Sequence, residues 1–296
     1  MRNTQPTSTA WRLGRLNRVS RLKESLHIAG QTLKKWASDL GIRKPPRLVS
    51  FRRSKNLEGN LRGRRADQLL RVCGHSKRYL EIGLFEGRTF EAVNAPQKVG
   101  VDPYPRFWSP FPPAGIDVFR GTSRDFFRRY SGELFDLIYL DGLHEAWETY
   151  LDFTDALVVL RTDGGILIDD VLPSDFESSL PDPELSRAAK LASGTKHHRW
   201  YGDVWRLAAL LTTKYSDFDL EMIGSGVTEK GNDHGQLFVR PRRPASEINL
   251  DRARDRAYME GLKFEEAIGA SGALTKIATP ETSAMKKILG KGRPNA

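Results

Sequence analysis

Cysteine and long apolar runs are nearly absent from this sequence. Cys73 is the one cysteine among 296 residues, which excludes an internal disulfide and a cysteine-type metal cluster. A chain without disulfides fits a reducing compartment, so we expect a cytoplasmic protein. No apolar run approaches the ~20 residues that a bilayer-spanning helix needs. Membrane association, if the protein has it, would have to be peripheral.

Acidic residues are scarce near the N-terminus. Residues 1–65 contain 17 Lys and Arg against 3 Asp and Glu, whereas the rest of the chain contains 30 against 34. The net charge of +10 therefore belongs to an N-terminal extension. We expect a basic helical extension over 1–65, a main domain over 66–244 and a helical tail over 245–296. This distribution makes nucleic acid a less favoured partner of the main domain.

The extension has the pattern of a basic amphipathic helix. Arginines recur every three residues beside an apolar face with helical spacing, and the pattern could continue to Leu40 before Pro45 and Pro46 stop it. Such a helix could pack on its own domain or on a second subunit of a homo-oligomer. It could also bind a membrane surface or nucleic acid, or be a cleaved transit peptide, because residues 1–23 contain no acid. The two faces consist of Arg12, Arg15, Arg18 and Arg21, and of Leu13, Leu16, Val19, Leu22 and Leu26.

The stretch Arg78–Phe90 reads as a strand, a glycine turn and the start of a helix. Gly83 and Gly87 permit backbone angles closed to other residues and allow a ligand to approach the main chain. Glu81 places a carboxylate at the mouth of the strand. The spacing is neither the dinucleotide-binding G-x-G-x-x-G nor a P-loop. Alone, it also suits an ordinary strand-to-helix turn.

Strands and helices alternate after this stretch, which predicts a parallel sheet with helices on both faces. In such sheets, ligands bind beyond the carboxyl ends of the strands. Acidic residues end four of the five predicted strands, and this repetition indicates one shared cleft. The further strands are 98–102, 116–120, 135–141 and 164–170, with helices over 124–130 and 144–160, and the acids are Glu81, Asp102, Asp141, Asp169 and Asp170.

Four motifs in this order resemble class I S-adenosylmethionine-dependent methyltransferases. They are Arg78–Phe90, V-G-V-D at 99–102, D-L-I-Y-L-D-G-L-H at 136–144 and G-G-I-L-I-D-D-V-L-P at 164–173. The most similar branch is bacterial, has an I-D-G-x-H strand end and includes metal-dependent sugar O-methyltransferases. The resemblance covers residues 66–241. It implies a Rossmann-like, doubly wound α/β fold with a seven-stranded, mostly parallel sheet whose last pair is 220–224 and 236–239.

The resemblance also implies a place for the cofactor, S-adenosylmethionine. Glu81, Gly83 and Gly87 would line its methionine end, and Asp102 would accept hydrogen bonds from the ribose hydroxyls. Asp141 would face the methyl group and the acceptor. Thr122 and Ser123 would lie near the adenine. Alternatively, either residue could cap the helix that follows.

In the metal-dependent sugar enzymes that this sequence resembles, strand-end acids hold a divalent ion. By position, these are Asp141, Asp169 and Asp170, and three oxygen ligands suit Mg²⁺ or Ca²⁺ better than zinc. The ion would lower the pKa of an acceptor hydroxyl, and His144 could take its proton as general base. Alternatively, Asp170 could cap the following turn, and His144 could cap the helix or hold the fold.

These expectations favour an enzyme that methylates a hydroxyl of a sugar, glycan or small polyol. One alternative is a nucleic-acid or protein methyltransferase that holds its substrate with the basic extension. The sequence D-P-Y-P at 102–105 resembles the D-P-P-Y of amino-methylating enzymes, but it follows the second strand instead of the fourth. The other alternative is a non-catalytic scaffold with the same fold.

Several connecting segments carry expectations of their own. The aromatic stretch 104–111 could be a lid or a packed loop, and 174–195 is expected to be a mobile cover near the acceptor. We expect Asp203 to cap a helix running to about Lys214, with Trp205 in the core. In the tail, we expect a helix from Ser246 to Ala267 and a final helix beginning beside Pro280.

Overall fold

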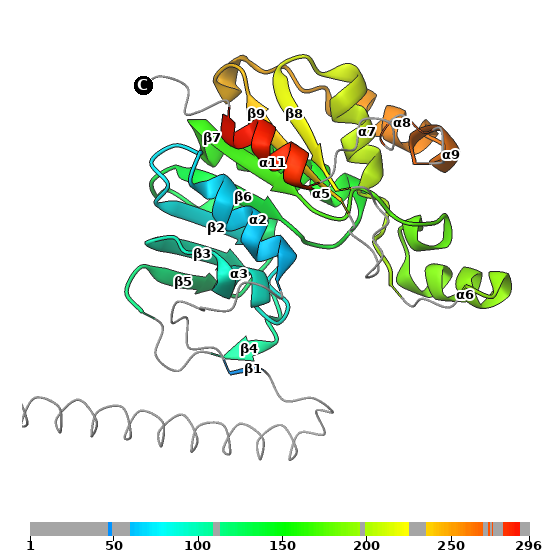
Figure 1. Ribbon diagram of the computed structural model, residues 1–296, viewed down its shortest axis with the longest axis horizontal. Helices are drawn as coiled ribbons and strands as arrows, with labels where there is room; N and C mark the ends of the chain where they lie inside the picture. Colours follow the sequence, from blue (N-terminus) through cyan, green and yellow to red (C-terminus); the bar gives the residue numbers. More distant parts are fainter. Residues whose placement is uncertain are drawn as a thin grey trace, which may run out of the picture.

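The computed structural model describes residues 47–48, 60–108, 113–195, 199–224, 235–268, 272, 274 and 281–290. The predicted basic helix over 12–40 lies outside the described residues. A short strand, β1 (Arg47–Leu48), pairs in parallel with β4 (Phe107–Trp108) as a separate two-stranded sheet. This pairing brings residues 47–48 of the basic extension beside the segment that joins β3 (Gln97–Val101) to β5 (Ile116–Phe119) of the main sheet (Figure 1).

A seven-stranded sheet forms the centre of the domain, in the order β5-β3-β2-β6-β7-β9-β8. β9 pairs antiparallel with both of its neighbours, and the other pairs are parallel. The order reverses between β2 and β6, which is where such sheets bind ligands. The predicted doubly wound fold is confirmed. The strands are β2 (Arg78–Ile82), β3 (Gln97–Val101), β5 (Ile116–Phe119), β6 (Phe135–Leu140), β7 (Leu160–Ile168), β8 (Phe218–Ile223) and β9 (Gln236–Pro241).

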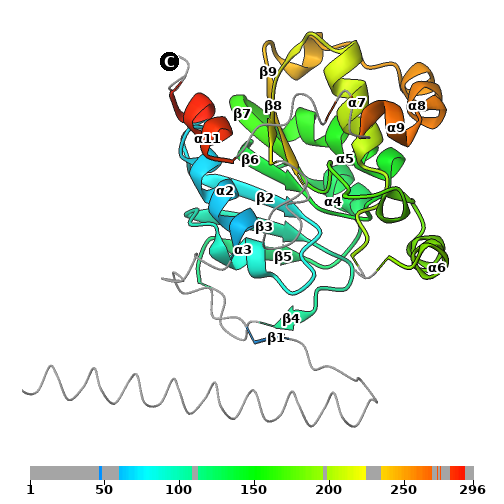
Figure 2. The ribbon, with the colours of Figure 1, turned by 45° about the vertical axis from the view of Figure 1, so that its right-hand side comes forward.

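Helices cover both faces of the sheet, as Figures 1 and 2 show. Every residue of β6 is buried, and its side chains alternate between two apolar clusters because successive residues of a strand point to opposite faces. Leu137 and Tyr139 belong to one cluster, Ile138 and Leu140 to the other. One face carries α2 (Leu61–Leu70), α3 (Arg88–Ala92) and α11 (Glu281–Gly290), and the other carries α4 (Ser123–Arg129), α5 (Ala146–Val159) and α7 (Trp205–Lys214).

The first helix of the domain, α2, begins before the expected domain boundary at residue 65. Asn60 caps α2 by accepting a hydrogen bond from the Gly63 backbone N–H at 2.9 Å. A side-chain cap of this kind fixes where a helix begins. The boundary expected at residue 65 therefore divided this helix and assigned its first turn to the extension.

Two segments beyond β7 also differ in detail from expectation. The stretch expected to be a mobile cover contains a short 3₁₀ turn, η1 (Glu177–Ser179), and a helix, α6 (Pro183–Ser193). The single tail helix expected over 246–267 is wrong. Asp251 starts a new helix by accepting from the Arg254 N–H at 3.1 Å, which leaves Ser246 in a 3₁₀ turn. The tail elements are η2 (Ala245–Glu247), α8 (Arg252–Gly261) and α9 (Phe264–Ala267).

A buried carboxylate attaches the tail to the domain. Asp255 of α8 is 0% exposed and accepts hydrogen bonds from the hydroxyls of Tyr150, at 2.8 Å, and Tyr215. Arg254 pairs with the same carboxylate at 3.3 Å. Since α5 and the end of α7 supply the two tyrosines, this contact joins three helices.

Replacing Asp255 with Ala should therefore destabilise the protein. Two buried hydroxyls would lose their acceptor, at a cost of about 3 kcal/mol in the free energy of unfolding. Glu260→Ala is the matched control, because Glu260 lies on the same helix in an exposed pair with Arg256, worth less than about 1 kcal/mol. Urea unfolding of both variants measures the difference, and equal stabilities would contradict this role of Asp255.

Candidate active site

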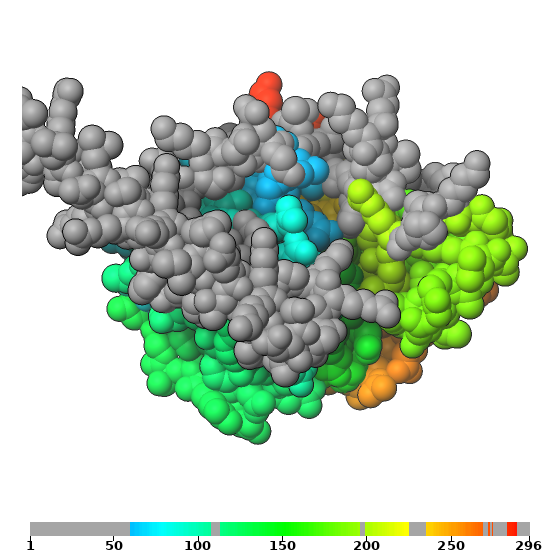
Figure 3. Space-filling model, turned by 90° about the horizontal axis from the view of Figure 1, so that it is seen from below, coloured from blue at the N-terminus to red at the C-terminus, as the bar shows by residue number. Residues whose placement is uncertain are grey.

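A cavity of about 900 Å³ lies at the carboxyl edge of the sheet. It opens beside the reversal of strand order, between the ends of β2, β3 and β6. Figure 3 shows the molecule from below, with α2 in blue near the centre of this face. All five predicted strand-end acids lie in this region: the lining includes Glu81, Asp102 and Asp141, and Asp169 and Asp170 lie within ion-pair distance of the lining residue Arg62.

The glycine turn requires both of its glycines. Gly83 has a φ of 87°, and a Cβ there would lie 1.9 Å from the carbonyl oxygen of Asp141. The ends of β2 and β6 can approach this closely only with glycine at this position. Gly87 has a φ of 67° and caps α3, and a Cβ there would lie 2.7 Å from the Phe107 ring.

Asp102, which follows β3, holds the glycine turn in place. Its Oδ2 accepts the backbone N–H groups of Leu84 and Phe85, each at 2.9 Å, and its Oδ1 accepts that of Tyr104 at 2.7 Å. A carboxylate offers about four acceptor positions, so one remains for a ligand hydroxyl. The residue predicted to bind ribose is thus also the residue that shapes the loop.

Glu81 lies deeper in the cavity wall. Its side chain is 1% exposed and accepts a hydrogen bond from the Tyr79 hydroxyl at 2.6 Å. Burial raises the pKa of Glu81 to about 8, against the opposing effect of this hydrogen bond. A cationic group bound beside Glu81 would stabilise its ionised form.

Arg62, in the first turn of α2, reaches over the acids that follow β6 and β7. Its Nε lies 2.7 Å from Asp169 Oδ2, its Nη2 2.9 Å from Asp170 Oδ1 and its Nη1 3.4 Å from Asp141 Oδ2. Burial would lower the pKa of Arg62, but the three carboxylates raise it well above its usual value. Arg62 is not among the predicted site residues, because the charge pattern places residue 62 in the basic extension. Recognising Asn60 as a helix cap would have placed it in the domain.

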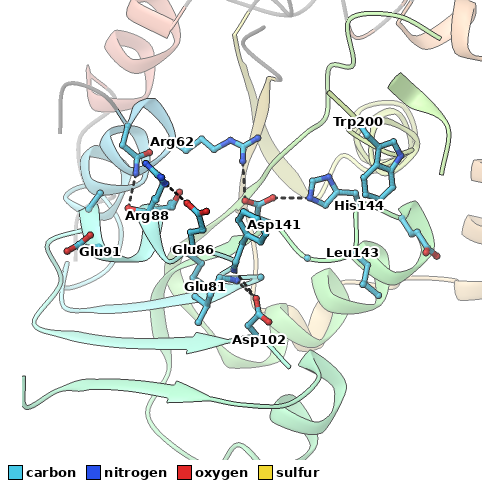
Figure 4. Close-up of a pocket in the computed structure, with 18 of the residues that line it drawn as sticks. Arg62, Glu81, Glu86, Arg88, Glu91, Asp102, Asp141, Leu143, His144 and Trp200 are labelled. Carbon is cyan, nitrogen blue, oxygen red and sulfur yellow. Dashed lines mark hydrogen bonds and ion pairs between the residues drawn. The ribbon is translucent and has the colours of Figure 1, made fainter. Parts of the chain in front are cut away.

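His144 faces the same acids from the opposite side (Figure 4). Its Nδ1 lies 2.9 Å from Asp170 Oδ2 and its Nε2 3.5 Å from Asp141 Oδ1. Its ring stacks on Trp200, with 5.1 Å between centroids. Burial would lower the pKa of His144, but Asp170 and Asp141 outweigh it and raise the pKa to about 9. Burial likewise raises the pKa of Asp141 to about 8, although Arg62 opposes it.

The backbone around His144 is unusual. His144 and Asp170 have φ values of 60° and 57°, a left-handed conformation that costs energy for residues other than glycine. The backbone N–H of Asp203 donates to the His144 carbonyl at 3.1 Å. The Asp203 carboxylate accepts the N–H of Ala146 at 2.7 Å and so caps α5. Asp203 had been expected to cap the helix that follows it in sequence, α7. The segment after residue 199 thus fixes the position of His144.

The other predicted residues lie outside this group. Thr122 and Ser123 are not among the residues that line the cavity, and Thr122 caps α4 by accepting from the Asp125 N–H at 3.1 Å. Their adenine contact stays a prediction. Trp205 is 1% exposed, which confirms its place in the core. Phe107 is buried at 3%, as the packed-loop alternative predicts for its part of the aromatic stretch.

The group of side chains placed to hold an ion shares two residues, Asp141 and Asp170, with the predicted metal ligands. Among the described residues, the side chains whose ligand atoms lie within 4.8 Å of one another are Asp141, His144 and Asp170. The predicted third ligand, Asp169, instead accepts from the Tyr139 hydroxyl and pairs with Arg62. Metal binding at this site therefore depends on whether Arg62 keeps its ion pairs with Asp141, Asp169 and Asp170.

Comparisons with known proteins agree with this fold. Residues 73–171, from before β2 to just after β7, match a family described as a methyltransferase domain. The match covers about a third of the chain, and the predicted enzyme class, an S-adenosylmethionine-dependent methyltransferase, is confirmed. No curated protein matches the chain.

Solved structures resemble it at low identity. The O-methyltransferase TomG from Streptomyces achromogenes, in complex with SAM, is 18% identical (TM-score 0.38, covering 64% of this chain and 81% of that one). The O-methyltransferase from Bacillus cereus, in complex with SAH, is 16% identical (0.41, 75% and 91%). SAH-bound methyltransferase PaMTH1 from Podospora anserina is 15% identical (0.40, 82% and 100%).

Within the described residues, the helices are too short or too polar to cross a membrane.

The position of His144 can be tested through Gly202. This glycine has a φ of 69°, and a Cβ there would lie 1.8 Å from the His144 carbonyl oxygen. Gly202→Ala should cost more than about 3 kcal/mol in the free energy of unfolding. Gly194→Ala is the control: φ is 74° but nothing lies within 4 Å, so it should cost about 1 kcal/mol from backbone strain alone. Equal losses in thermal or urea unfolding would contradict the close approach.

Proposed function

We propose that the chain transfers a methyl group from S-adenosylmethionine to a hydroxyl of a sugar, glycan or small polyol. One observation carries the proposal. Carboxylates at the carboxyl ends of three strands (Glu81, Asp102 and Asp141) line one cavity with the glycine turn, at the reversal of strand order. Its volume of about 900 Å³ lies within the range of ligand pockets, about 300–1,000 Å³.

The residues near the glycine turn fit the cofactor. Gly83 lines the cavity, and its lack of a side chain lets the end of β2 lie against Asp141 there. Asp102 keeps an acceptor position for a ribose hydroxyl. Glu81, whose pKa burial raises to about 8, would become ionised beside the cationic amino group of the methionine part. Gly87 and the start of α3 complete this side.

The acceptor would occupy the opposite side of Asp141, where Figure 4 shows Leu143, His144 and Trp200. The Trp200 indole presents a flat apolar surface next to polar groups, an arrangement that suits a sugar ring or polyol carbon chain with several hydroxyls. The sulfonium of the cofactor supplies an already activated methyl group. The chain therefore has to align the acceptor and take its proton.

His144 is the proposed base, with Asp141 beside it to orient the hydroxyl. Asp170 holds one ring nitrogen, and the other lies toward Asp141 and the cavity. Because its pKa is raised to about 9, His144 carries a proton at neutral pH and becomes a base as the pH rises.

The pH dependence of kcat/KM tests this role. A base acts in its deprotonated form, so the rate should rise with pH and level off above about 9. His144→Ala should remove this rise and lower turnover by about 100-fold, with cofactor affinity nearly unchanged. Labelled methyl donor and a panel of glycan and polyol acceptors provide the assay.

Other outcomes of the same assay point elsewhere. A rise near pH 8 that survives in His144→Ala would assign the base to Asp141. Parallel loss of cofactor binding and turnover would mean that His144 has a structural role.

Cofactor binding tests the proposal more directly. Asp102→Asn keeps one oxygen for the Leu84 and Phe85 N–H groups but loses the other acceptor, so its affinity for S-adenosylmethionine in calorimetry should fall about 10-fold or more. Asp117→Asn, at an exposed position of the neighbouring β5, should bind like the wild type. Unchanged affinity in Asp102→Asn would refute the ribose contact, and no binding by the wild type would favour a scaffold.

The basic extension is a separate part of the proposal. Its membrane contact, its place in a homo-oligomer and its alternative use in holding a nucleic acid or protein substrate stay predictions, because residues 1–46 lie outside the described part. The small-acceptor reading is supported by the cavity and by the acidic balance of residues 66–296.

A further inference from the structure

We propose that Arg62 is the permanent counter-ion of the three strand-end carboxylates and that it keeps a divalent cation out of them. The inference deepens the proposed function, on which it rests for the location of cofactor and acceptor. With Arg62 in this role the site works without a metal, whereas the sequence predicts Mg²⁺ at Asp141, Asp169 and Asp170.

The geometry of the guanidinium supports this role. Each of its three nitrogens faces a different carboxylate: Nε faces Asp169, Nη2 faces Asp170 and Nη1 faces Asp141, at 2.7–3.4 Å. A planar fork of donors matches several carboxylates at once, which an ammonium group cannot do. The arrangement resembles the way in which one metal ion gathers acids from neighbouring strands.

The backbone of Arg62 is held in place by its surroundings. Asn60 caps the helix at Gly63 and donates from its amide to the carbonyl of Arg88 at 2.8 Å. Gly63 lies so near α3 that a Cβ would be 2.5 Å from that of Ala92. Because α2 and α3 are packed this closely, the Arg62 side chain starts from a fixed point beside the acids.

A divalent ion does not fit beside this side chain. Bound to Asp141, His144 and Asp170, an ion would share the carboxylates of Asp141 and Asp170 with Arg62. Two cations a few ångströms apart in a partly buried site repel each other strongly. The third acid, Asp169, already accepts from Tyr139 and Arg62 and is 2% exposed.

Arg62 acts on the reaction through these acids and is therefore a positioning residue. Asp170 is shared between Arg62 Nη2 and His144 Nδ1, so the guanidinium fixes the carboxylate that orients the proposed base. Loss of Arg62 should lower kcat while changing the apparent KM for the cofactor little, because the cofactor residues Asp102 and Gly83 keep their contacts.

Calorimetric titration with MnCl₂ alone tests the exclusion of metal. Mn²⁺ accepts carboxylate and imidazole ligands. Arg62→Met removes the charge but keeps an unbranched side chain, and it should bind one Mn²⁺ at least about 100-fold more tightly than the wild type. Arg62→Lys keeps the charge and should still exclude the ion. Arg71→Met, at the exposed far end of the same helix, should behave like the wild type.

Two results would overturn the proposal. Stoichiometric, tight Mn²⁺ binding by the wild type would mean that Arg62 moves aside for a metal, and this titration decides the matter even if Arg62→Met does not fold. A folded Arg62→Met that binds no Mn²⁺ would mean that the guanidinium is not what excludes the ion. Adding Asp170→Asn to Arg62→Met should abolish Mn²⁺ binding, which assigns the ion to this cluster.

The same samples separate this inference from the proposed function. S-adenosylmethionine is titrated into each variant without metal. If the wild type binds S-adenosylmethionine and, in the separate titration, also binds Mn²⁺, the role of Arg62 is refuted and the proposed methyltransferase function stands. If no variant binds S-adenosylmethionine, but Mn²⁺ is excluded from every variant with a charged residue 62 and binds to Arg62→Met, the proposed function is refuted. The role of Arg62 as counter-ion then stands.

Discussion

Three carboxylates, from the ends of the neighbouring strands β6 and β7, lie close enough to share one guanidinium. Asp169 and Asp170 are each 2% exposed, and placing several buried negative charges together is costly unless cations balance them. Arg62 and His144 supply that balance from opposite sides. The position of α2 on the sheet and the chemistry at the carboxyl edge are therefore parts of one electrostatic arrangement.

The same arrangement explains the strained backbone at the site. His144 and Asp170 both adopt left-handed angles, and each is held by contacts from elsewhere in the chain. Gly202 and Asp203 hold the His144 backbone, Trp200 holds its ring, and Arg62 and His144 hold the Asp170 carboxylate. Strain of this kind persists where the surrounding structure over-determines it, and it is common at functional sites. The ring nitrogens of His144 are thereby directed between the acids and the cavity.

Much of the sheet could be predicted from the sequence because its signals are local. Apolar runs that end in acids marked β2, β3, β6 and β7, and the carboxyl ends of parallel strands necessarily meet at one edge. The start of the tail helix was predicted wrongly because Ser246 and Asp251 are both good helix caps, and the apolar pattern does not show which of them begins the helix. Charge content placed the domain boundary at residue 65, and this choice hid Arg62.

Other features of the site have no local signal. The stacking of Trp200 on His144 and the capping of α5 by Asp203 join segments more than 50 residues apart. Nothing in L-D-G-L-H or I-D-D predicts a positive φ at His144 or Asp170, since neither is glycine. The pKa of His144 depends on Asp170 and Asp141 in the folded chain, so the sequence could suggest a base but not that it is protonated at neutral pH.

A crystal structure of the protein with S-adenosylhomocysteine, grown with Mg²⁺ present, tests the account most directly. The account predicts the homocysteine part beside Gly83 and Glu81, a ribose hydroxyl on Asp102, and the Arg62 guanidinium still between Asp169 and Asp170. A ligand bound away from the glycine turn would contradict the proposed function. An Mg²⁺ ion on Asp141 and Asp170, with Arg62 turned out to solvent, would contradict the electrostatic arrangement on which the rest depends.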